Sequence, residues 1–207
     1  MSARNPTVFV VDDEPPVRQA VARLLRSAGI DACVFGSPQE FLLGYDSAAP
    51  GCLVLDVAMP GLNGLELQRA LAERGSELPI IFLTGRADIP MSVQAMKGGA
   101  SDFLTKPVHD QDLLAAIRRA LQRDAERRQA GAEVDKIRAR VATLTPRERE
   151  VLAHVVSGQL NKEIAGDLGT VEQTIKVHRA RVMEKMGVRS VAELVRLAAR
   201  LGIDGKD

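Results

Sequence analysis

Five short aliphatic runs, separated by amphipathic segments, restrict the fold of the first 120 residues more than any other feature. The runs are Thr7–Val11, Ala32–Phe35, Cys52–Asp56, Ile80–Thr84 and Asp102–Thr105. Between the first two, apolar side chains recur at helical spacing, as Val17, Val21, Leu24 and Leu25 do. Apolar strands that alternate with helices are typical of a parallel sheet with both faces buried. We therefore predict an α/β domain over residues 1–121: a doubly wound, five-stranded parallel sheet of the flavodoxin-like order 2-1-3-4-5.

Residues 122–142 are predicted to form a helical linker. Helical periodicity runs from Asp110 to Ala142 but becomes highly charged between Gln122 and Gln129. If all of these residues are helical, the helix is about 50 Å long at about 1.5 Å per residue. Because the apolar stripe is interrupted, we favour a solvated spacer over the alternative, the seam of a coiled-coil dimer.

Residues 143–207 show no strand pattern and several helix starts. Capping boxes begin at Thr145, Thr170 and Ser190, and Asn161 is placed to cap a further helix. A short turn around Gly169 lies between the helix that begins at Asn161 and the next helix. These signals predict a second, all-α domain of four helices that contains a helix-turn-helix.

Charge and cysteine content narrow the function classes. Residues 1–121 hold 11 Lys and Arg against 14 Asp and Glu, whereas residues 143–207 hold 11 against 9. No apolar run approaches the roughly 20 residues of a membrane-spanning helix, and no cleavage signal follows the first strand. Cys33 and Cys52 lack metal-ligand spacing and are expected to be buried in a reducing compartment. We expect a cytoplasmic protein without membrane contact.

Polar side chains stand at the carboxyl ends of four of the predicted strands. Asp12 and Asp13 follow the first, Asp56 ends the third, Thr84 ends the fourth and Lys106 follows the fifth. In the order 2-1-3-4-5 the first and third strands are neighbours, so the carboxylates converge and require a cation, for which Mg²⁺ is suited. Lys106 and Thr84 then supply an ammonium and a hydroxyl for phosphoryl oxygens. The competing interpretation is that these residues are helix caps and solvated charges. Dinucleotide binding is disfavoured because no Gly-rich loop follows the first strand.

At these positions the chain resembles the receiver domains of two-component response regulators. The resemblance covers roughly residues 6–121 and rests on Val-Val-Asp-Asp-Glu, Leu-Val-Leu-Asp with the following Met-Pro-Gly, Phe-Leu-Thr-Gly and Phe-Leu-Thr-Lys-Pro. It implies that a histidine kinase phosphorylates Asp56, and that Asp13, Asp56 and the Ala58 carbonyl hold Mg²⁺ while Asp12 acts through water. It also implies that Thr84 and Lys106 bind the acyl phosphate, that Phe103 is the aromatic partner of Thr84, and that Lys106-Pro107 is cis.

The helix after Gly169 has a polar face suited to the major groove of DNA. We expect Val171, Ile175, Val182 and Met186 to point inward. On the outer face, Gln173 and Lys176 are placed to read base edges, and Val177 and Ala180 to contact thymine methyls. Phosphate contacts are expected from Thr174, His178, Arg179 and Arg181.

Residues 143–201 resemble the LuxR-type helix-turn-helix through Leu-Thr-Pro-Arg-Glu-Arg-Glu-Val-Leu, Asn-Lys-Glu-Ile-Ala and Thr-Ile-Lys-Val-His-Arg. With the receiver, this is similar to response regulators of the FixJ type. The resemblance implies a transcription activator, not an enzyme, with a sensor histidine kinase, double-stranded promoter DNA and RNA polymerase as partners and a homodimer as the phosphorylated form. The alternative from another class is a receiver that serves as a phosphate sink or protein-docking module without sequence-specific DNA binding.

Overall fold

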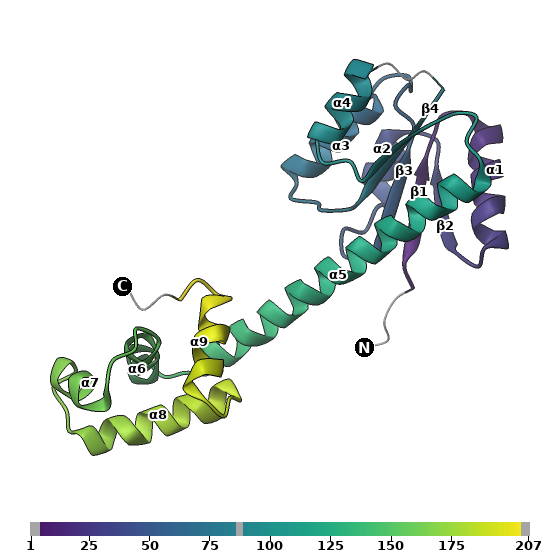
Figure 1. Cartoon of the computed structure of the whole chain (residues 1–207). Coiled ribbons are helices and arrows are strands. Elements are labelled where there is room, and N and C mark those ends of the chain that lie inside the picture. Colours follow the sequence, from purple (N-terminus) through teal and green to yellow (C-terminus); the bar gives the residue numbers. More distant parts are fainter. Residues whose placement is uncertain (1–4, 86–88, 204–207) are drawn as a thin grey trace. The chain divides into compact units, whose positions relative to one another are not determined.

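A five-stranded parallel sheet forms the centre of the amino-terminal half of the chain (Figure 1). The computed structural model describes residues 5–85 and 89–203. The strands are β1 (Thr7–Val11), β2 (Asp31–Phe35), β3 (Gly51–Leu55), β4 (Ile80–Thr84) and β5 (Asp102–Thr105). Their order, β2-β1-β3-β4-β5, confirms the predicted doubly wound topology.

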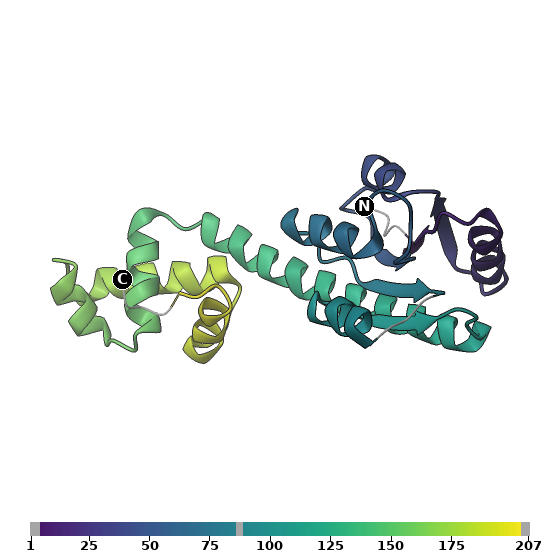
Figure 2. The same ribbon diagram turned by 90° about the horizontal axis from the view of Figure 1, so that it is seen from above.

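Helices cover both faces of this sheet, as Figures 1 and 2 show. Side chains alternate along β1, so Val8 and Val10 face one layer while Phe9 and Val11 face the other. The first layer consists of α1 (Pro15–Ser27) and the beginning of α5 (Asp110–Ala142). The second consists of α2 (Pro38–Gly44), α3 (Gly64–Glu73) and α4 (Ile89–Lys97).

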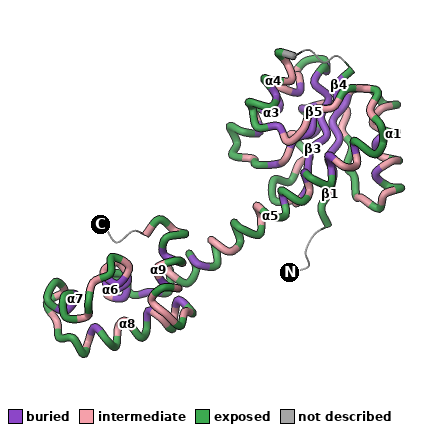
Figure 3. The backbone as a smooth tube through the Cα atoms, viewed as in Figure 1, coloured by how far each residue is buried: buried purple, intermediate pink, exposed green. Residues whose placement is uncertain are grey.

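The edge strand β2 departs from the expectation of burial on both faces. Its first four residues are exposed, and Cys33 is exposed rather than buried, so that prediction was wrong. The reason is position: β2 pairs only with β1, whereas β3 lies between two strands and all five of its residues are buried (Figure 3). Cys52, on β3, is buried as predicted.

The carboxy-terminal half contains the four predicted helices and a hydrophobic core of its own. They are α6 (Pro146–Val156), α7 (Asn161–Asp167), α8 (Glu172–Met186) and α9 (Val191–Ala199). Val151, Ile164, Ile175, Val182 and Leu194 are fully buried in this core.

Two of the expected helix caps are absent from these helices. The reciprocal box of Thr145 and Glu148 is present, and Ser190 accepts a hydrogen bond from the Glu193 N–H. The box expected at Thr170 does not form, because α8 begins one residue later and its N-cap, Val171, is 65% exposed rather than inward. Asn161 lies inside α7, not at its cap, and its side chain is used elsewhere.

The long helix α5 contributes to two compact units, residues 1–127 and residues 128–207. Leu113 and Ile117 belong to the core of the first unit, and Ile137 to that of the second. The charged stretch is not simply solvated, because Asp124 is only 2% exposed. Within the described residues, no helix is both long and apolar enough to cross a membrane.

Because the two units have separate cores, Ile164→Ala is expected to destabilise the carboxy-terminal unit by about 2–5 kcal/mol and leave the first unit unchanged. The measurement is denaturant unfolding followed by amide exchange in both units. Leu160→Ala, at a site 68% exposed, is the control and should change stability by less than about 0.5 kcal/mol. Equal loss of protection in both units would contradict the separation.

Candidate functional site: an acidic pocket and a helix-turn-helix face

Three carboxylates meet at the carboxyl end of the sheet. β1 and β3 are paired in register, with Val11 opposite Leu55, so the residues that follow each strand emerge side by side. Asp12, Asp13 and Asp56 each place a carboxylate oxygen within 4.8 Å of the others. Asp12 and Asp56 are buried, and Asp13 is half-buried. The predicted convergence of these side chains is therefore present.

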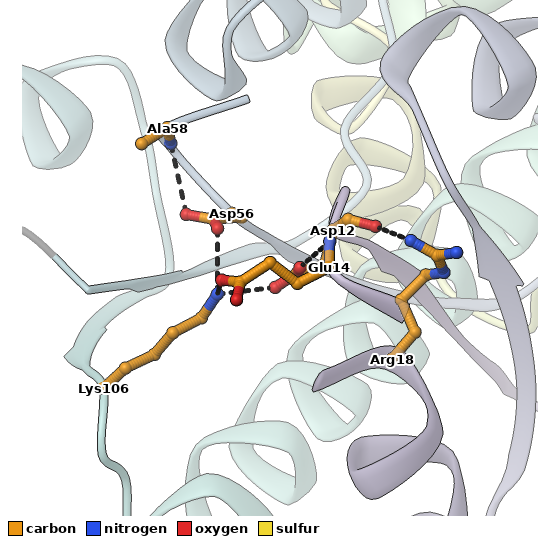
Figure 4. A network of polar contacts seen from close by, with 6 residues as sticks. All are labelled: Asp12, Glu14, Arg18, Asp56, Ala58 and Lys106. Carbon is orange, nitrogen blue, oxygen red and sulfur yellow. Dashed lines mark hydrogen bonds and ion pairs between the residues drawn. The ribbon is translucent and has the colours of Figure 1, made fainter. Parts of the chain in front are cut away.

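The ammonium of Lys106 bridges two of these carboxylates (Figure 4). Its Nζ donates to Asp12 Oδ2 at 2.7 Å and to Asp56 Oδ2 at 2.8 Å. Burial by itself would lower the pKa of Lys106, but the hydrogen bonds and charges of Asp12 and Asp56 outweigh it and raise the pKa above its ordinary value. The cation is therefore held charged, facing into the pocket.

Burial raises the pKa of Asp12, against the opposing effects of Lys106 and of the Glu14 N–H, which donates to Asp12 Oδ1 at 2.8 Å. The first turn of α1 thus closes the pocket on one side. Arg18 donates to the backbone carbonyl of Asp12 at 2.5 Å, and Glu14 Oε1 lies 3.4 Å from Lys106 Nζ. Our sequence analysis assigned Glu14 and Arg18 no role. The position of Glu14 directly after two aspartates was the signal available.

Backbone contacts place Thr84 and Ala58 beside the pocket. Thr84 is fully buried at the end of β4, and its carbonyl accepts from the Lys106 N–H at 2.8 Å. Lys106-Pro107 is cis, as the resemblance implied. The Ala58 N–H donates to Asp56 Oδ1 at 3.1 Å. Phe103 packs against Phe82, with ring centroids 6.1 Å apart, and lies two residues before Thr105, the neighbour of Thr84 on β5.

A glycine lets α3 approach the pocket closely. A Cβ at Gly64 would lie 2.2 Å from the carbonyl oxygen of Asp56, a distance that no side chain tolerates. Gly64 allows the chain after β3 to fold back directly beside Asp56, which fixes the backbone that carries the Asp56 carboxylate.

The donor set of the pocket fits a hard divalent cation. Carboxylate oxygens are the ligands that Mg²⁺ prefers, and three of them lie close enough together to share one ion. Such an ion supplies charge that stabilises phosphoryl oxygens. Among the described ion pairs, Lys106 pairs with Asp12 and Asp56 but not with Asp13.

The second candidate site is the outer face of α8. The side chains expected to meet base edges and methyl groups are exposed: Gln173, Lys176, Val177 and Ala180. Arg181 is also exposed, whereas Thr174, His178 and Arg179 are half-buried. On the opposite side, Ile175, Val182 and Met186 are fully buried, as predicted. The helix therefore presents one polar face and is anchored by the other.

Two polar contacts hold α8 against its neighbours. Arg179 donates to Asn161 Oδ1 at 2.8 Å, which joins α8 to the first turn of α7. Lys185 donates to Glu148 Oε2 at 2.6 Å, which joins the end of α8 to the start of α6. The Lys185 hydrogen bond and the Thr145 N–H hold the pKa of Glu148 at about 2. Part of the Arg179 guanidinium therefore holds α8 in its orientation against α7.

Two family descriptions match this chain. Residues 8–118 match the response regulator receiver domain, and residues 142–198 match the luxR family of bacterial regulatory proteins. Together they confirm both resemblances seen in the sequence.

Whole-length relatives have the same two-part organisation. Nodulation protein W of Bradyrhizobium diazoefficiens is 47% identical over 95% of this chain and 86% of its own length. The transcriptional regulatory protein FixJ of Azorhizobium caulinodans is 43% identical over 97% of this chain and 95% of its own length. A low-resolution structure of the response regulator StyR has 48% identity and a TM-score of 0.87, covering 95% of this chain and all of that one.

The Glu148–Lys185 contact predicts a pH dependence of stability. Because the folded-state pKa of Glu148 is about 2, below the ordinary value of 4.5, its contribution is present above about pH 4.5 and is lost as the pH falls toward 2. Glu148→Gln is therefore expected to lower the unfolding free energy at pH 7. The difference from wild type should shrink between pH 4.5 and 2, measured by denaturant titration at each pH. A difference that does not change with pH would contradict this assignment.

Proposed function

The chain belongs to the two-component response regulators that join a receiver to a LuxR-type DNA-binding domain, and on that premise we propose that phosphorylation of Asp56 controls its binding to promoter DNA. The observation that carries the proposal is the bridge from Lys106 to Asp12 and Asp56, with Asp13 beside it. The pocket combines an acceptor carboxylate, a fixed cation and oxygen ligands for Mg²⁺.

Asp56 is the phosphate acceptor in this proposal because its carboxylate accepts hydrogen bonds from a cation and from a backbone N–H. Oδ2 accepts from Lys106, and Oδ1 accepts from the Ala58 N–H. Attack by a carboxylate oxygen on a phosphoryl group requires positive charge around the transferred oxygens. Lys106 supplies part of that charge. Asp13, Asp56 and the Ala58 carbonyl would hold Mg²⁺, with Asp12 acting through water, and the bound ion would supply the rest.

Thr84 and Phe103 form the switch in the proposed function. Phosphorylation adds about two negative charges at a buried position. The Thr84 hydroxyl and Lys106 then move toward the phosphoryl oxygens. This movement shifts α4, which follows Thr84 in the chain, and β5, which carries Phe103. The face we propose for the homodimer lies around Val93, Lys97 and Phe103, and Val93 on α4 is 44% exposed.

DNA recognition is assigned to α8. Gln173 and Lys176 reach base edges, Val177 and Ala180 contact thymine methyls, and Thr174, His178, Arg179 and Arg181 meet phosphates. A sensor histidine kinase is the phosphate source, and RNA polymerase is the further partner of a transcription activator. A cytoplasmic location follows from these partners. The alternative, a phosphate sink without DNA binding, is disfavoured by the exposed polar face of α8.

Asp56→Asn is expected to abolish labelling by acetyl phosphate in the presence of Mg²⁺, because an amide is not a nucleophile for phosphoryl groups at neutral pH. Labelling is measured with a radioactive donor, and folding by circular dichroism. The control is Asp112→Asn, an exposed carboxylate of the same unit, which should label at the wild-type rate. Persistent labelling of a folded Asp56→Asn variant would refute the assignment.

Arg181→Ala and Lys176→Ala should affect DNA binding differently. Loss of the Arg181 phosphate contact should weaken binding to all sequences and reduce the slope of log K against log salt by about 0.9. Loss of Lys176 should cost about 1–3 kcal/mol on the specific site and relax its sequence preference. Both are measured by fluorescence anisotropy on selected and scrambled duplexes.

Arg138→Ala is the matched control, since Arg138 lies on α5 and its side chain is 68% exposed. It should retain wild-type affinity and salt slope. A fragment used to test DNA binding alone should begin at residue 128, because Ile137 belongs to the core of this unit. Absence of sequence-dependent binding by the folded fragment would favour the phosphate-sink alternative.

A further inference from the structure

The inward face of α5 changes from apolar to ionic without a break in spacing. Leu113, Ile117 and Ala120 are buried in the core of the first unit. Asp124 and Arg127 continue the same stripe at the next helical intervals, four and three residues further on. Asp124 is 2% exposed, while its neighbours Arg123 and Ala125 are exposed. The helix is therefore attached to the sheet beyond its last apolar contact.

Among the described contacts, Asp124 accepts hydrogen bonds from β3 and from the next turn of its own helix. Oδ2 accepts from the backbone N–H of Gly51 at 2.9 Å, and Oδ1 accepts from Arg127 Nη2 at 2.5 Å. Arg127 in turn donates through Nη1 to Glu77 at 2.5 Å, in the segment that leads into β4. This set, Gly51, Glu77, Asp124 and Arg127, is called the α5 anchor below. It connects the helix to two neighbouring strands.

The anchor holds the end of β3 opposite to Asp56. Gly51 is the first residue of β3, and Asp56 follows its last residue, about 17 Å away at about 3.3 Å per residue. A Cβ at Gly51 would lie 1.9 Å from the Thr7 carbonyl oxygen, so β1 and β3 meet there without room for adjustment. The hydrogen bond to Gly51 places the Asp124 carboxylate against β3, where its charge adds to the effect of burial in raising the pKa of Cys52 to about 12.

Stability alone does not account for a buried carboxylate at this position. A buried ion pair gives no more stability on average than apolar side chains of similar size, because removing two charges from water opposes their attraction. An aliphatic residue at 124 would also have continued the apolar stripe. What the carboxylate adds is direction, since it must face one N–H and one guanidinium.

On the basis of the proposed function, we propose that Asp124 is a positioning residue that fixes the register and direction in which α5 leaves the receiver. The segment 122–129 has Ala125 as its one apolar residue, so the described contacts that attach it to the sheet are polar, and those of Asp124 and Arg127 are among them. A helix released there frays or pivots. A change at Asp56 then reaches the DNA-binding unit through a loose connection, and phosphorylation loses its effect on DNA affinity.

The test compares full-length Asp124→Asn and Asp124→Leu with wild type and with Glu126→Gln, an exposed carboxylate two residues away. Three quantities are measured: the rate of labelling by acetyl phosphate, the thermal midpoint, and the ratio of DNA affinities with and without phosphodonor. We expect Asp124→Leu to label like wild type, its midpoint to fall because the buried Gly51 N–H loses its acceptor, and its affinity ratio to fall at least about fivefold. Glu126→Gln should match wild type in all three. A purely structural role would lower the midpoint and leave the affinity ratio unchanged.

Trypsin cleavage after Arg127 and Arg128 reports on the anchor independently of DNA. Both Asp124 variants should be cut faster there than wild type and Glu126→Gln. Affinity ratios equal to wild type in both Asp124 variants would overturn the positioning role while leaving the proposed function intact. Wild-type protein that labels at Asp56 but gains no DNA affinity would overturn the proposed function, and the positioning role with it, whatever the cleavage pattern.

Discussion

The contact on which the rest of this structure depends is the bridge between Lys106 and two buried carboxylates. Asp12 and Asp56 would repel each other in a poorly solvated pocket, and a fixed ammonium at 2.7 and 2.8 Å removes that repulsion. The bridge joins the ends of β1, β3 and β5. The charge balance of the pocket and the positions of these three strand ends therefore depend on the same contact. Any group that adds negative charge to Asp56 must draw on the same cation.

The central strand β3 is closely packed along its length and at both of its ends. β3 is buried along its whole length, Gly64 brings α3 against one of its ends, and Gly51 brings β1 against the other. The α5 anchor then ties the long helix to the end of β3 that lies far from the pocket. In this protein a helix that looked like a spacer is part of the receiver as far as Arg127 and part of the second core from Ile137.

The carboxy-terminal unit separates the residues that hold the recognition helix from those that face outward. Ile175, Val182 and Met186 anchor α8, while Asn161 and Glu148 orient it through Arg179 and Lys185. Packing and the exposed face therefore depend on different side chains of the same helix.

The sequence by itself determined the order of elements, the topology of the sheet and the membership of the acidic pocket, because strand periodicity and the rule that parallel strands end at one edge are local or topological facts. Only the tertiary structure decided which residues are buried at the edges of elements and which side chains meet across the chain. The edge position of β2 leaves Cys33 exposed, and the later start of α8 leaves Val171 outside the core. Glu14 and Asp124 acquire partners that are far away in the sequence, Lys106 and Gly51. A charged residue reads as solvated in a sequence, and only the packed neighbours reveal that its charge is buried and matched.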